Sequence, residues 1–285
     1  MPSLREQYHT MVRWSPVMMR MAMVSAALLC VALIGLVVDD RLITGAPAWL
    51  KPAKFGASGA IYLVTMTWMM RDLPRTRTVR TATWLTAWIL ALETSVIALQ
   101  AARGTTSHFN IDTPLDTAIY SGMGIGIATV WIMSVVLLWK HLRTPAADRT
   151  LALALRVGLA LNILGAGVGW TMTQPRAEQF AAMQRNERPF VAGSHTVGAP
   201  DGGAGLPLTQ WSREHGDLRI PHFIGMHAWQ LLPLLLLGLR RLRTATNDGA
   251  ERTIMLVASS ACAALFIAAF VQALAGHPLI PPPTS

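Results

Sequence analysis

The residue types that could do chemistry gather in two segments of an otherwise apolar sequence. In the first, Thr86, Glu93 and Gln100 follow one another at intervals of seven, which places them on one stripe of a helix. Glu93 lies ten residues before Arg103, so about 15 Å of helical rise separates it from that end. An ionisable side chain this deep in an apolar helix is costly and is a functional candidate by default. The alternative is a neutral glutamate that bonds to a neighbouring helix and serves only to hold the two together.

The stripe runs into the segment Gln100–Asn110, which reads QAARGTTSHFN. It places Arg103, His108 and Asn110 where one helix ends and the next begins. Helix capping accounts for Gly104 and for a polar residue such as Asn110. Capping does not account for His108, which is either a solvated loop residue or a ligand.

The second segment, Gly216–Gln230, reads GDLRIPHFIGMHAWQ. On a helical projection His222, His227 and Gln230 fall within an arc of about 140°. Gly225 removes side-chain bulk between them, so another group can approach. Interfacial placement and interhelical hydrogen bonds are the structural alternative to a functional role.

Histidine can bind a metal or haem and can carry protons. His108, His222 and His227 are therefore the candidate metal ligands, and Gln100 and Gln230 join them as candidate cofactor-binding residues. The cofactor itself is unknown, with haem or a transition metal as the candidates. The histidines of the second segment are five residues apart and no H-E-x-x-H occurs, so the zinc-helix pattern is absent and any metal needs ligands from several helices.

The elements that must position these residues are transmembrane helices. The chain is 52% hydrophobic and only 14% charged, and a spanning helix needs about 20 mostly apolar residues. We predict an all-α integral membrane bundle of about seven helices in a single transmembrane domain, 1–285. The predicted helices are 18–38, 53–71, 80–102, 114–139, 150–172, 221–239 and 252–275, with a long periplasmic loop, 173–220, between helices five and six.

The arginine distribution predicts the orientation and the location. Arginines concentrate before the first helix and in alternate connections, which under the positive-inside rule places the N-terminus inside and the C-terminus outside. The same rule accounts for the formal charge of +9 without nucleic acid as a partner. The lipid bilayer is the one partner that the sequence indicates, and the predicted location is a bacterial inner membrane.

Together these predictions favour a polar cavity that opens to the periplasm. Glu93 would be its catalytic or titrating group, and the histidines and glutamines would line it. Its mouth would carry the remaining polar candidates, which are Lys54, Arg103, Asn110, Asp217 and Arg219.

The two segments, with Lys51–Phe55 (KPAKF), resemble those of an uncharacterised family of bacterial polytopic, seven-helix membrane proteins. The shared patterns are QAxRGxxSHFN and GDLRxxHFxGxHxxQ, and the resemblance spans most of the chain. It implies a multi-pass membrane fold and brings no activity with it.

Three functional hypotheses remain open at this point. The first is a redox or metal-dependent membrane enzyme with histidine ligands. It is slightly favoured because histidines outnumber carboxylates among the residues predicted to line the cavity. The second is a proton-coupled transporter or carrier that uses Glu93. The third is a membrane sensor or binding protein without catalysis.

Overall fold

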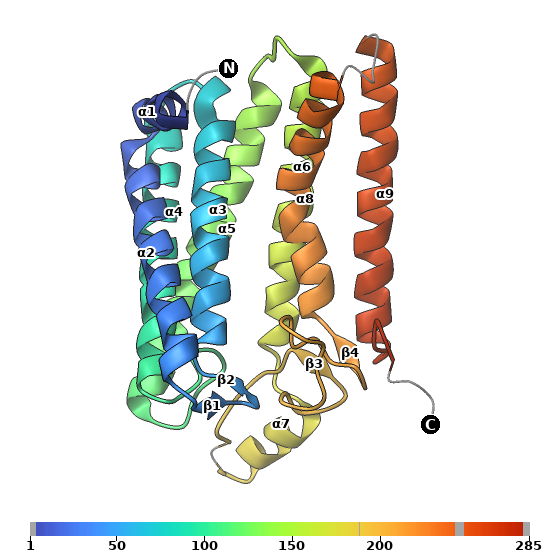
Figure 1. Ribbon diagram of the computed structural model, residues 1–285. Helices are drawn as coiled ribbons and strands as arrows, with labels where there is room; N and C mark the ends of the chain where they lie inside the picture. The colour runs from blue at the N-terminus through green and yellow to red at the C-terminus, as the bar shows by residue number, and fades with distance from the viewer. Residues whose placement is uncertain (1–3, 188, 243–247, 282–285) are drawn as a thin grey trace. The chain divides into compact units, whose positions relative to one another are not determined.

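The computed structural model describes residues 4–187, 189–242 and 248–281, and most of them are helical (Figure 1). The helical elements are α1 (Leu4–Trp14), α2 (Pro16–Val38), α3 (Leu50–Met69), the short 3₁₀ turn η1 (Met70–Asp72), α4 (Arg77–Ala102), α5 (Pro114–Arg143), α6 (Arg149–Met172), α7 (Ala177–Gln184), α8 (Arg219–Leu242) and α9 (Asp248–Leu274). Two short antiparallel pairs complete the fold: β1 (Leu42–Ile43) with β2 (Ala46–Pro47), and β3 (Thr196–Val197) with β4 (Gly216–Asp217).

Six of these helices are long and apolar enough to cross a membrane, namely α2, α4, α5, α6, α8 and α9. The chain is therefore a helical, multi-pass membrane protein by the length and composition of its helices. The 20-residue α3 corresponds to the predicted helix 53–71 but is not among the six. It begins at Leu50 and so takes in Lys51 in addition to Lys54, and these two charges lower its apolar character.

The helices fall into two compact units, Met1–Lys140 and His141–Ser285. In the first unit, α2 packs on α3 and α4, and α1 lies across one end of α2 (Figure 1). Close helix contact in a membrane requires small residues. A Cβ atom at Gly56 of α3 would lie 2.9 Å from the backbone nitrogen of Leu29 on α2, so glycine is required for this approach.

In the second unit, α6 and α8 pack along their length, and α9 lies against both (Figure 1). The backbones of α6 and α8 meet at Gly165 and Gly225, where a Cβ atom on Gly225 would lie 2.6 Å from the Cα of Gly165. Where α8 ends and α9 begins, Arg240 bonds both to Asp148, the N-cap of α6, and to Glu251 of α9. This ion-pair triad joins three helices at the end remote from the β3–β4 pair.

The segment that connects α6 to α8 is structured. It contains α7 and the β3–β4 pair, in which Thr196 lies opposite Asp217. Asp217 therefore lies at the point where this connection meets the start of α8.

Candidate functional site

The predicted stripe on α4 is buried along its length. Thr86 and Gln100 are 0% exposed and Glu93 is 7% exposed, whereas Trp84 and Trp88 are exposed. The seven-residue spacing thus places the polar stripe on the packed side of the helix and the indoles on its surface.

Glu93 has no hydrogen-bond partner among the residues that the structure describes. Its Oε1 faces the backbone of Gly126 on α5, where an added Cβ would lie 3.1 Å from the oxygen. The hydroxyl of Thr86, two turns away on the same stripe, is also buried and lacks a partner in the described part of the chain. A glutamate that only joins helices must bond to its neighbour, so this geometry does not support the structural alternative for Glu93.

The end of the stripe that leads into α5 is, by contrast, fully bonded. The Gln100 side-chain amide donates to Asp116 Oδ1 at 3.0 Å, and Arg103 donates to the same oxygen at 2.8 Å. Arg103 also donates to the Gln100 carbonyl oxygen, and Thr113 donates to Asp116 Oδ2 at 2.5 Å. Arg103 thus neutralises the 4%-exposed Asp116, and Gln100 donates a further hydrogen bond to it.

The α4–α5 connection is organised around Asn110, which is completely buried. Its amide donates to Thr105 Oγ1 and to the Thr106 carbonyl, and its side-chain oxygen accepts from the backbone N–H of Asp112. Asn110 is thus a turn-forming residue.

His108 projects from the turn organised by Asn110. Its Nδ1 lies 3.0 Å from Ser107 Oγ, and its ring packs near Phe55 of α3 with the centroids 5.7 Å apart. Lys54 is exposed one residue before Phe55. The structure therefore brings Lys54 and His108 into one neighbourhood, in the same compact unit as Glu93.

The two histidines of α8 share one hydrogen-bonding arrangement. His222 Nδ1 lies 2.8 Å from the carbonyl oxygen of Gly165, and His227 Nδ1 lies 2.8 Å from that of Phe223. A carbonyl oxygen can only accept, so each ring must carry its proton on Nδ1. In a neutral ring, Nε2 is then left with a lone pair for a proton, a metal or a ligand. The space predicted beside Gly225 is occupied by α6.

Gln230 completes the predicted α8 group and differs from the histidines. Its Oε1 is buried and has no hydrogen-bond partner in the described residues. Asn162 of α6, by contrast, donates to the carbonyl of Met226 at 3.0 Å, so it joins α6 to α8.

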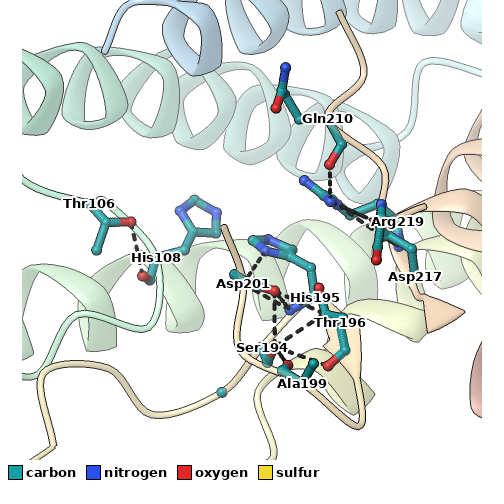
Figure 2. Close-up of polar contacts among 12 residues, drawn as sticks. Thr106, His108, Ser194, His195, Thr196, Ala199, Asp201, Gln210, Asp217 and Arg219 are labelled. Atoms are coloured by element: carbon teal, nitrogen blue, oxygen red, sulfur yellow. Dashed lines mark hydrogen bonds and ion pairs between the residues drawn. The ribbon is translucent and has the colours of Figure 1, made fainter. Parts of the chain in front are cut away.

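The start of α8 is held by Asp217 and Arg219 (Figure 2). Asp217 is 0% exposed and accepts from the Arg219 guanidinium at 2.6 Å and 2.9 Å and from the Ser212 N–H at 2.7 Å. Arg219 also donates to the carbonyl of Gln210. The two predicted mouth residues therefore form an ion pair with each other.

A second carboxylate, Asp201, organises the turn before β3 (Figure 2). It accepts from Ser194 Oγ at 2.9 Å, from the Thr196 N–H at 2.9 Å, and from His195 Nδ1 at 2.7 Å. Burial alone would raise the pKa of Asp201, but the hydrogen bonds from His195 and Thr196 outweigh it and leave that pKa well below the usual range.

The predicted residues are thus divided between the two compact units. The first unit holds Lys54, Glu93, Gln100, Arg103, His108 and Asn110, and the second holds Asp217, Arg219, His222, His227 and Gln230. Across residues 4–187, 189–242 and 248–281, no three His, Cys, Asp or Glu side chains are placed to hold a metal ion. A closed metal site of three or more such ligands is therefore not present in the described part of the chain.

Comparison of the chain with protein-family models, with curated proteins and with solved structures finds no match.

Proposed function

We propose that this chain is a proton-coupled membrane carrier in which Glu93 takes up and releases the proton. The observation that carries the proposal is a contrast among buried acids. The described structure buries four acidic side chains, and three of them, Asp116, Asp217 and Glu251, bond to an arginine. Glu93 is the exception.

The isolation of Glu93 favours proton exchange over charge pairing. A carboxyl group without a cation in an apolar helix can be neutralised only by a proton. Its Oε1 faces a glycine, so solvent or a substrate meets no side chain at that point on α5.

The proposal includes seven spanning helices, with α3 as the seventh, the N-terminus inside, and a bacterial inner membrane as the location. The arginine distribution supports this arrangement. The end of α4 near Arg103 then faces the periplasm, and Glu93 lies about 15 Å below it.

The test compares Glu93→Gln with Glu93→Asp in proteoliposomes that contain a pH-sensitive dye. With an imposed membrane potential we expect slow proton slippage through the parent protein in the absence of its solute, a loss of about tenfold or more of that flux in Glu93→Gln, and partial retention in Glu93→Asp. Glu187→Gln is the matched control because Glu187 is exposed and bonds to Arg185.

Infrared spectroscopy gives a second measurement that does not depend on knowing the coupled solute. We expect a protonated-carboxyl band that titrates with pH and is missing in Glu93→Gln. Unchanged flux and an unchanged carboxyl band in that variant would refute the proposal.

A second function, a haem- or metal-dependent redox enzyme, is favoured by the α8 histidines. Histidines that ligate metals almost always donate their other ring N–H to a carbonyl or carboxylate, as His222 and His227 do. Haem iron takes one or two axial ligands from the protein, so haem fits the described residues better than a closed zinc site does.

A further inference from the structure

The connection between α6 and α8 contains a cavity that the proposed function does not use. Its volume is about 260 Å³, slightly below the range of drug-sized ligand pockets, so an occupant would be small. Its lining includes Gly203, Gln210, Ser212, Glu214, His215 and Arg219. It combines charged and polar side chains with alanine, proline and glycine, and the whole lining belongs to one compact unit.

Of the charged side chains in this lining, some are paired with an opposite charge and others are not. The Arg219 guanidinium bonds to both oxygens of Asp217 and to the Gln210 carbonyl, so its charge is already balanced. Arg213 is adjacent in the sequence to two lining residues but does not line the cavity. The cavity therefore presents no uncompensated cation in the described structure.

Glu214 supplies the uncompensated negative charge. Its carboxylate has no bonding partner among the described residues, and Oε2 lies beside Gly203, where an added Cβ would be 3.3 Å away. The side chains of Gln210 and His215 likewise have no partner there, and they offer hydrogen-bonding groups. A carboxylate with hydrogen-bonding side chains around it is complementary to a small cation that also forms hydrogen bonds.

We propose that this cavity binds a small organic ammonium compound. Glu214 would pair with the ammonium group, and Gln210 and His215 would bond to its polar substituents. A metal ion is disfavoured as the occupant because the described residues hold no cluster of three metal-ligating side chains.

The experiment titrates ethanolamine and putrescine into the detergent-purified full chain by calorimetry. Sodium acetate and glycerol serve as the anionic and neutral probes of similar size. We expect both amines to bind, and Glu214→Gln to weaken them at least tenfold, while Glu187→Gln binds as the parent does.

A second variant tests the position of the site without altering its charge. Gly203→Leu places a side chain beside the Glu214 carboxylate, and we expect it to block amine binding. Binding of acetate or glycerol as strong as that of the amines, or equal amine binding by the parent and Glu214→Gln, would overturn the proposal. Because Glu214 and Glu93 are changed in separate variants, failure here is distinguishable from failure of the carrier proposal.

Discussion

Replacing Gly225 with alanine tests whether the approach of α6 and α8 holds the second unit together. The added Cβ would lie 2.6 Å from the Gly165 Cα and 2.9 Å from the Leu161 carbonyl oxygen. Ordinary contact begins at 3.4 Å, so the helices must separate by about 0.8 Å. Both obstructing atoms belong to backbone, so no side-chain rotation can relieve the clash.

The expected cost combines two opposing effects. Overpacking of this kind costs about 1–3 kcal/mol, and alanine in place of glycine in a helix returns about 0.5–1 kcal/mol. We expect a net loss of about 1–2 kcal/mol in the free energy of unfolding. The separation would also lengthen the bond from His222 Nδ1 to the Gly165 carbonyl.

Gly238→Ala on the same helix is the matched control, because an added Cβ there meets no atom within 4 Å. This variant should gain only the higher helix propensity of alanine and be stabilised by about 0.5–1 kcal/mol. The assay is unfolding in mixed detergent micelles, followed by tryptophan fluorescence. Equal stabilities for Gly225→Ala and Gly238→Ala would refute the packing argument.

Two further predictions concern other parts of the second unit. The Arg240 side chain holds the pKa of Asp148 below its usual range. The ion pair therefore contributes fully to the free energy of unfolding above about pH 4, and this contribution is lost as the pH falls through the lowered pKa of Asp148. Asp148→Asn keeps the helix cap but loses the ion pair with Arg240. Its melting temperature should lie below that of the parent at pH 6, and the difference should narrow below pH 4. A difference in melting temperature that does not change with pH would contradict the role given to this ion pair. If the α8 histidines bind haem, the purified protein should show a Soret band that His222→Ala removes and that His9→Ala, a change on the exposed face of α1, retains. A folded, colourless and metal-free parent protein would exclude the redox function.

The long helices were predictable because their ends are marked in the sequence. The α4 helix ends at Ala102 before Gly104, whose φ of +75° favours glycine, and Asp148 caps α6 as its residue type suggests. The α1 and α7 helices were not predicted. They are short and polar, so they lack the apolar runs on which the assignment of spanning helices depends.

The candidate site was predictable in its residue types but not in its partners. Spacing alone placed Glu93 on the buried side of α4 and His222 near the start of α8. It could not show that His222 bonds to the Gly165 carbonyl, because a backbone acceptor exists at every residue and leaves no mark in the sequence. It also could not show that Arg103 and Arg219, the predicted mouth residues, each pair with an aspartate.

The carrier and structural interpretations of Glu93 also differ in their consequence for stability. A glutamate that held helices together would lose a hydrogen bond on replacement by leucine, and the protein would be destabilised. Glu93 has no such bond to lose among the described residues, so Glu93→Leu removes only the cost of a buried polar group. We therefore expect Glu93→Leu to be at least as stable as the parent while it loses proton flux. That combination separates a group kept for proton exchange from one kept for packing, because packing alone would lower both.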